Sequence, residues 1–134
     1  MSRKVLIVDD DPDFRSAVKA ILKKAGYVCC EASSAHQGLR SALEEKPDII
    51  LLDVMMEDIS SGFRFVNERK MTEDRNKEPH IPILIMTSIQ MLTSLDFKKR
   101  IDDILYEEDH FMDKPVTSDK LLGKIEEMVC SCCK

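Results

Sequence analysis

The stretch that decides the fold is residues 5–12, which read VLIVDDDP. Residues 5–8 form a continuous apolar run, as expected of a strand that is buried on both faces of a sheet. The run ends at three aspartates, and the third, Asp11, suits a helix N-cap because its carboxylate can accept a bond from a free backbone N–H. Pro12 suits the first turn of that helix. A buried strand that leads directly into a helix indicates an α/β protein.

The alternation of a short apolar run with an amphipathic stretch repeats five times along the chain. Gly26 ends the first helix, a capping box of Ser34 and Gln37 starts the second, and Pro47 ends it. Strands alternating with helices predict a single doubly wound parallel sheet of five strands, with five helices on its two faces. The expected strands are residues 5–8, 27–30, 49–52, 83–86 and 111–112, and the expected helices are residues 12–25, 34–47, 62–77, 90–105 and 117–129.

Length and composition fit one globular domain. The chain has 134 residues, of which we expect about 3–129 to form the core and 130–134 a cysteine-rich tail. A net charge of −5 argues against a sequence-independent grip on nucleic acid, which depends on a basic surface. The N-terminus lacks the apolar stretch that a signal peptide or a membrane span needs. We therefore expect a cytoplasmic protein without direct contact to nucleic acid or membrane.

The cysteines and histidines do not indicate a separate site. An odd number of cysteines without an export signal argues against a disulfide framework, and adjacent cysteines rarely pair. The three cysteines of the tail are too few for a closed zinc site, which needs four ligands, so we expect a reduced, frayed terminus. The histidines lack metal-ligand spacing and are expected to be structural or exposed. These residues are Cys29, Cys30, Cys130, Cys132, Cys133, His36, His80 and His110.

Chemistry-bearing residues follow four of the five expected strands. In parallel α/β sheets, ligands bind at the carboxyl ends of the strands. We therefore expect three carboxylates, hydroxyl groups and one ammonium group to meet at a single edge of the sheet. These residues are Asp9 and Asp10 after the first strand, Asp53 after the third, Thr87 and Ser88 after the fourth, and Lys114 before Pro115 after the fifth.

This set of residues is suited to phosphoryl transfer. Three clustered carboxylates repel one another unless a cation neutralises them, and hard oxygen ligands favour Mg²⁺ or Mn²⁺. A carboxylate can also act as a nucleophile and form an acyl phosphate. A lysine and a hydroxyl group can then balance the charge on the transferred phosphoryl group.

At these positions the chain resembles the receiver domain of two-component response regulators, the CheY-like superfamily, over essentially its whole length. The resemblance rests on the acidic pair, on Asp53, and on the residues after the fourth and fifth strands. Phe111 corresponds to the family's switch aromatic residue, and Met56 to a common methionine three places after the phosphoacceptor. Each match is weak alone, but all of them occur in the family's order and register.

The resemblance implies a flavodoxin-like sheet in the order 2-1-3-4-5 and a chain that is not a turnover enzyme. A histidine kinase or phosphotransfer protein would phosphorylate Asp53. Asp10, Asp53 and the backbone carbonyl of Met55 would hold Mg²⁺, with Asp9 acting mainly through water. Lys114, Thr87 and Ser88 would bind the phosphoryl group, Phe111 would turn inward as part of the switch, and the peptide bond before Pro115 would be the candidate for a cis bond.

The chain also departs from the family pattern. Glu57 stands where proline is common and Gly62 comes one residue late, which predicts a reshaped loop after Asp53. Glu107 and Glu108 replace a common Gly-Ala pair, so the fourth helix and its output surface are open questions. Two positions that tune how water reaches the acyl phosphate are apolar here, Met55 and Ile89, and this predicts slow self-dephosphorylation.

Three other functions fit part of the sequence pattern. Asp9, Asp11 and Asp13 resemble the start of an EF-hand loop, but Phe14 and Ala20 stand where that loop needs glycine and glutamate. A haloacid-dehalogenase-like phosphatase would use Asp9 and Asp11 as its nucleophile motif, but it leaves Asp53 unexplained. A receiver-like interaction module that never takes phosphate stays open. The sequence also leaves open which downstream protein the chain contacts and whether it forms a homodimer. It does not distinguish a stand-alone receiver from a piece of a longer regulator.

Overall fold

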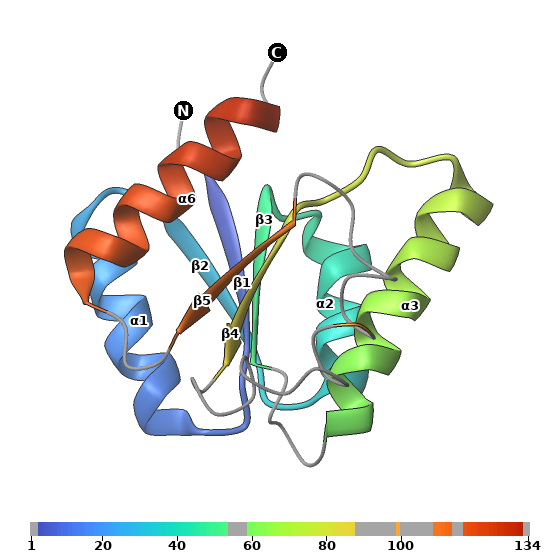
Figure 1. Ribbon diagram of the computed structural model, residues 1–134, viewed down its shortest axis with the longest axis horizontal. Coiled ribbons are helices and arrows are strands. Elements are labelled where there is room, and N and C mark those ends of the chain that lie inside the picture. Colours follow the sequence, from blue (N-terminus) through green and yellow to red (C-terminus); the bar gives the residue numbers. More distant parts are fainter. Residues whose placement is uncertain (1–2, 54–58, 88–98, 100–108, 114–116, 133–134) are drawn as a thin grey trace.

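The computed structural model describes residues 3–53, 59–87, 99, 109–113 and 117–132. This part of the chain forms a central sheet with helices packed on both of its faces (Figure 1). The strands are β1 (Lys4–Val8), β2 (Val28–Ala32), β3 (Ile49–Asp53), β4 (Ile83–Thr87) and β5 (His110–Asp113). The helices are α1 (Pro12–Lys24), α2 (Ala35–Glu45), α3 (Ile59–Asn76) and α6 (Ser118–Cys132).

All strand pairs of the sheet are parallel, and the strand order is β2-β1-β3-β4-β5. The α/β class and the strand order agree with the sequence prediction. The count of helices does not, because the described residues contain four rather than five. The helix predicted at 90–105 lies outside the described residues except for Lys99, which is helical.

Several element boundaries were predicted wrongly. β2 starts one residue later than expected and continues to Ala32, because Glu31 and Ala32 also pair with β1. α3 begins at Ile59, three residues before the predicted start at Gly62. Short apolar runs fix the existence of a strand, but its ends depend on the ladder of the neighbouring strand.

Two apolar layers hold the helices against the sheet. Alternate residues of each buried strand point to opposite faces, so Leu6 and Val8 pack toward α2 and α3, whereas Val5 and Ile7 pack toward α1 and α6. Figure 1 shows the same division, with α1 and α6 on one side of the sheet and α2 and α3 on the other. Burial on both faces explains why these strands are continuous apolar runs.

The helix caps are mostly those that the sequence predicts. The Asp11 carboxylate accepts a hydrogen bond from the backbone N–H of Asp13 at 3.0 Å and caps α1. Ser34 Oγ accepts from the N–H of Gln37 at 3.2 Å and caps α2. The return bond of the expected box differs, because Gln37 Oε1 accepts from the N–H of Ser33, one residue before the cap.

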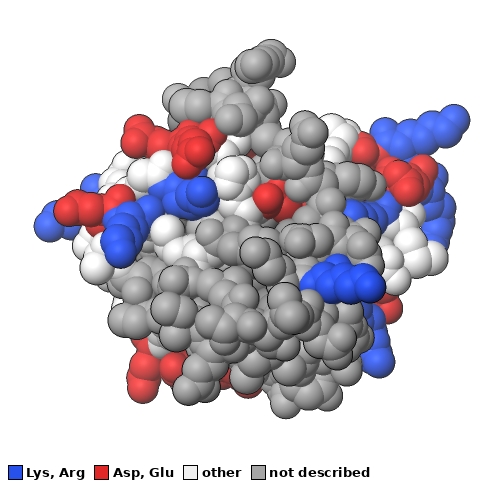
Figure 2. Space-filling view, in the orientation of Figure 1, with Lys and Arg blue, Asp and Glu red and all other residues white. Residues whose placement is uncertain are grey.

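Charged groups of both signs are intermixed on the described part of the face in Figure 2, and neither sign forms a continuous field there. Among the described residues, no helix combines the length and apolarity needed to cross a membrane.

Cys29 and Cys30 are free thiols, and burial raises the pKa of Cys30 to about 11. The side chains of the cysteine-rich tail lie outside the description.

A buried cluster of charged groups lies at the amino edge of the sheet, where β4 and β5 begin. His80 lies between two carboxylates, with Nδ1 2.7 Å from Glu73 and Nε2 2.8 Å from Asp109. Glu73 also accepts from Arg69 at 3.0 Å and from the N–H of Ile81 at 2.8 Å, and Asp109 accepts from the N–H of Ile83 at 2.8 Å. The cluster therefore joins α3 to the starts of both strands.

The charge state of His80 depends on these partners. Burial disfavours the charged imidazolium, but hydrogen bonds to Asp109 and Glu73 outweigh it and raise the pKa of His80 from 6.5 to about 9. Three of the four members are almost completely buried, namely Arg69, Glu73 and Asp109. A buried carboxylate needs such a partner, since an uncompensated buried charge is strongly destabilising.

Replacing each of two helical glycines by alanine tests the packing of α2. A Cβ at Gly38 would lie 2.9 Å from Phe65 and 3.0 Å from Val8, both fully buried, whereas a Cβ at Gly123 in α6 would meet nothing within 4 Å. Gly123→Ala should raise the free energy of unfolding by up to about 1 kcal/mol, through helix propensity. Gly38→Ala should lower it by about 1–3 kcal/mol, because overpacking exceeds that gain. Urea unfolding measures both, and equal effects of the two changes would contradict the packing.

A His80→Gln variant tests the buried cluster. Because folding raises the pKa of His80, its proton stabilises the folded state fully below about pH 6.5, and this stabilisation is lost as the pH rises through about 9. The difference in unfolding free energy between wild type and His80→Gln should therefore shrink by roughly 3 kcal/mol between these limits. Urea unfolding at several pH values measures it, with the exposed His36→Gln as control. A difference that stays constant with pH would show that folding does not raise the pKa of His80.

Candidate functional site

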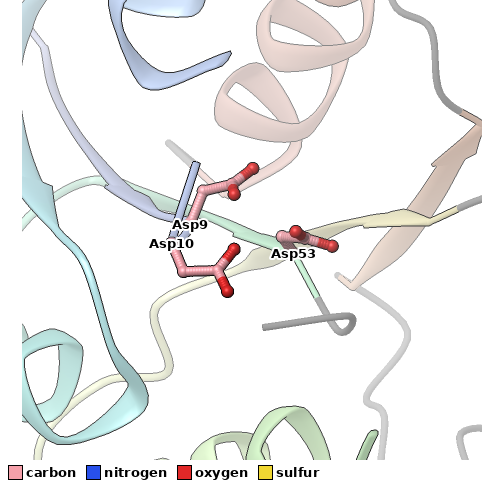
Figure 3. Close-up of side chains that lie close together, drawn as sticks. All are labelled: Asp9, Asp10 and Asp53. Atoms are coloured by element: carbon pink, nitrogen blue, oxygen red, sulfur yellow. The ribbon is translucent and has the colours of Figure 1, made fainter. Parts of the chain in front are cut away.

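Three carboxylates converge at the carboxyl edge of the sheet. β1 and β3 are neighbours and pair Val8 with Leu52, so the next residues along the two strands, Asp9 and Asp53, lie side by side. Asp10 follows in the loop to α1. Each of the three residues offers a carboxylate oxygen, and these oxygens all lie within 4.8 Å of one another. Figure 3 shows Asp9 and Asp10 extending from the end of β1 toward the side on which Asp53 lies at the end of β3.

The three carboxylates differ in their access to solvent. Asp9 is fully buried and Asp53 is only 4% exposed, whereas Asp10 is an exposed loop residue. The site therefore has a protein side formed by the strand ends and a solvent side at Asp10. This arrangement suits a cation that keeps several of its waters, as Mg²⁺ does.

Electrostatics favours a bound cation here. Two unit charges about 5 Å apart repel by about 3 kcal/mol at an effective dielectric constant of about 20, so three neighbouring carboxylates are costly without compensation. Oxygen ligands of this kind are those that Mg²⁺ and Mn²⁺ prefer. The residues present thus fit the metal that the sequence predicts.

Asp9 is held by bonds from three directions. Its backbone N–H donates to the carbonyl of Ala32 at the end of β2, at 3.1 Å. Its carboxylate accepts from the N–H of Asp11 at 2.9 Å. Its carbonyl accepts from Arg15 Nη1 in α1 at 2.7 Å. The position of the acidic loop therefore depends on β2 and α1 as well as on β1.

Sequence reasoning missed the contribution of Arg15 and of its partner Glu31. Arg15 Nε lies 3.3 Å from one carboxylate oxygen of Glu31, and Lys19 Nζ lies 3.0 Å from the other. Hydrogen bonds from Lys19 outweigh partial burial and, with Arg15, hold the pKa of Glu31 below its usual value. A basic residue one turn into a helix that follows an acidic loop is the only sequence signal for this role.

The structure places the other predicted site residues only in part. Thr87 is the last residue of β4, one position beyond Met86, which pairs with Asp53, so its backbone lies at the same sheet edge. The backbone of Phe111 lies in β5 opposite Ile85. The side chains of Thr87 and Phe111 lie outside the described part of the structure. The remaining predicted residues lie outside it altogether: Met55, Met56, Glu57, Ser88, Ile89, Glu107, Glu108, Lys114 and Pro115.

Comparisons with known proteins agree with this fold. The model of the response regulator receiver domain family matches residues 5–126. The chain is 31% identical to Protein PilH of Pseudomonas aeruginosa over 126 residues, which is 94% of this chain and 97% of that protein. It also resembles the solved structure of the chemotaxis response regulator CheY4 of Vibrio cholerae, with a TM-score of 0.79 and 28% identity over 96% of this chain and 99% of that one.

Other relatives are longer than this chain. The phosphate regulon transcriptional regulatory protein PhoB of Pseudomonas aeruginosa is 27% identical over 129 residues, which is 96% of this chain but 52% of that protein. The chain thus spans about half the length of this relative and nearly the full length of PilH. A family match over most of the chain, the flavodoxin-like fold of CheY and a cluster of acidic residues at the expected sheet edge lead to one conclusion: the chain belongs to the response regulator receiver domains of two-component systems.

Proposed function

We propose that Asp53 is the phosphoacceptor of this receiver domain and that Asp9, Asp10 and Asp53 serve a Mg²⁺-dependent transfer. The observation that carries this proposal is the convergence of three carboxylates within 4.8 Å at one sheet edge, with Asp53 nearly buried between neighbouring strands. A carboxylate fixed at a strand end is well placed as a nucleophile, because it need not be oriented anew at each encounter with a donor.

The transfer balances without a further reactant. A carboxylate oxygen of Asp53 attacks the phosphorus atom of a phosphohistidine on the donor protein. The new P–O bond forms as the P–N bond breaks, and the electron pair of the broken bond stays on the donor imidazole. Transfer of this kind is catalysed almost entirely by positioning and by charge stabilisation.

The acidic pair would support Asp53 in two ways. Asp10, on the solvent side, would hold the cation together with Asp53 and the backbone carbonyl of Met55, and the buried Asp9 would act mainly through water. When bound, Mg²⁺ or Mn²⁺ supplies positive charge that stabilises the phosphoryl oxygens. The bound cation would also reduce the repulsion among these carboxylates.

The remaining switch residues belong to the proposal through the family match. Lys114 would form an ion pair with the phosphoryl group, Thr87 and Ser88 would bind it, and Phe111 would move as part of the switch, with Pro115 as the candidate for a cis bond. A population shift toward the phosphorylated form needs such differential contacts. The backbone position of Thr87 beside Asp53 supports its part of the proposal.

The proposed setting is a single receiver domain, with its core at about 3–129, in the cytoplasm. A histidine kinase or phosphotransfer protein would supply the phosphoryl group, and a downstream protein or a second copy of the chain would read the phosphorylated state. Receiver domains are signalling domains rather than turnover enzymes. The phosphatase alternative loses its support, since the family model that matches is that of receiver domains.

Phosphorylation by a small donor tests the proposal. Incubation with acetyl phosphate and Mg²⁺ should add the mass of one phosphoryl group to wild type, and omission of Mg²⁺ or addition of a chelator should abolish the gain. Asp53→Asn should take up no phosphate, because the nucleophilic oxygen is lost. Intact mass spectrometry measures each case, with Asp74→Asn as a matched control on the exposed part of α3.

Two outcomes would contradict it. Labelling of Asp53→Asn to the wild-type extent would place the phosphate elsewhere. An unlabelled wild type, under conditions that label a known receiver domain, would favour an interaction module that never takes phosphate.

The lifetime of the acyl phosphate tests the two apolar positions that follow Asp53 and Thr87 in the sequence, Met55 and Ile89. Neither Met55 nor Ile89 can orient an attacking water, so the wild-type phosphate should decay more slowly than that of a Met55→Asn, Ile89→Gln double variant. General-base and water-orienting groups change such rates by about 100-fold or more when well placed, and we expect at least severalfold here. Loss of the phosphoryl mass with time after removal of the donor gives both rates. Equal decay rates for wild type and the double variant would contradict slow self-dephosphorylation.

A further inference from the structure

Arg15 joins the acidic loop to the neighbouring strand. In the first turns of α1, its Nη1 donates to the carbonyl oxygen of Asp9 at 2.7 Å and its Nε lies 3.3 Å from Glu31 at the end of β2. Lys19, one turn further along α1, lies 3.0 Å from the other carboxylate oxygen of Glu31. The Arg15 side chain is 18% exposed, so this geometry is held in a partly buried place.

The bond to Asp9 completes a set of constraints on that residue. Ala32 fixes its N–H, the N–H of Asp11 fixes its carboxylate, and Arg15 fixes its carbonyl group. The carbonyl of Asp9 belongs to the peptide bond that leads to Asp10. Restraining this peptide therefore restrains the direction in which the Asp10 chain leaves β1.

We propose that Arg15 is a positioning residue for the cation site, acting through the main chain of Asp9 and held in place by Glu31 and Lys19. This inference rests on the proposed function, because it concerns the cation that Asp9, Asp10 and Asp53 would hold. Arginine suits the role, since its planar group has donors in a fixed fork that can hold two acceptors at once.

A simple charge argument predicts the opposite effect. Removing a positive group near three carboxylates makes the site more negative, so electrostatics alone predicts tighter binding of a divalent cation. Glu31 offsets part of that charge, because it forms ion pairs with both Arg15 and Lys19. The loss of positioning then outweighs the gain in negative charge, so removal of Arg15 should weaken binding of the divalent cation.

Mn²⁺ binding measured by electron paramagnetic resonance of the free ion separates the two effects. Arg15→Met keeps the length of the aliphatic stem but has no donor, and should weaken Mn²⁺ binding about five- to tenfold, the size of one ordinary intramolecular hydrogen bond. Arg15→Lys keeps the charge and a single donor nitrogen but not the fork, so its Mn²⁺ affinity should fall between those of wild type and Arg15→Met. Arg40→Ala, at an exposed site on α2, removes the same charge elsewhere and should bind like wild type.

A charge-balanced variant makes the test sharper. Arg15→Met combined with Glu31→Gln leaves the net charge unchanged, so electrostatics predicts wild-type affinity, whereas the positioning role predicts weakening as in Arg15→Met. Urea unfolding confirms that each variant is folded. If Arg15→Met does not fold, Arg15→Leu, which also has an aliphatic side chain without charge or donor, carries the same prediction.

The outcomes also separate this inference from the proposed function. If wild type binds Mn²⁺ and Asp53 is labelled, but Arg15→Met binds as tightly as wild type or more tightly, the positioning role is wrong and the proposed function stands. If wild type neither binds Mn²⁺ nor takes up phosphate, the proposed function fails. Weaker binding in Arg15→Met and in the charge-balanced variant, with Arg40→Ala unchanged, establishes the role.

Discussion

The parallel pairing of β1 with β3 is the constraint on which the site depends. In this register Val8 lies opposite Leu52, so the first residues beyond the apolar part of each strand, Asp9 and Asp53, meet at the same edge. The register is in turn fixed by burial on both faces, because a slip by one residue would move every apolar side chain to the other layer. The chemistry at the edge thus follows from the packing of the core.

The two edges of the sheet balance charge in different ways. At the amino edge, Glu73 and Asp109 receive their positive partners from within the chain, as His80 and Arg69. At the carboxyl edge, the described residues bring together three carboxylates that suit a cation from solution. The first edge therefore contributes to holding α3, β4 and β5 together, and the second is suited to respond to a ligand. The two clusters lie at opposite edges of the same sheet.

Sequence alone predicted the parts that depend on local patterns. Continuous apolar runs indicated the strands, and the residues following them indicated the acidic site. The His80 cluster escaped prediction because its members are brought together by tertiary structure, with Asp109 lying 29 residues after His80. The role of Arg15 was missed because its bond is to a main-chain atom, and a basic residue one turn into the helix is too weak a sequence signal to predict it. The start of α3 was missed because the polar residues before Gly62 have no clear apolar period.

The most direct test of the central claim is to locate the phosphate on the chain. Borohydride reduces an aspartyl phosphate to homoserine, so the phosphorylated protein can be reduced, digested and mapped by mass spectrometry. The account predicts reduction at position 53 alone, dependent on both phosphodonor and Mg²⁺. Reduction at Asp9 or Asp10 instead, with position 53 unchanged, would contradict it.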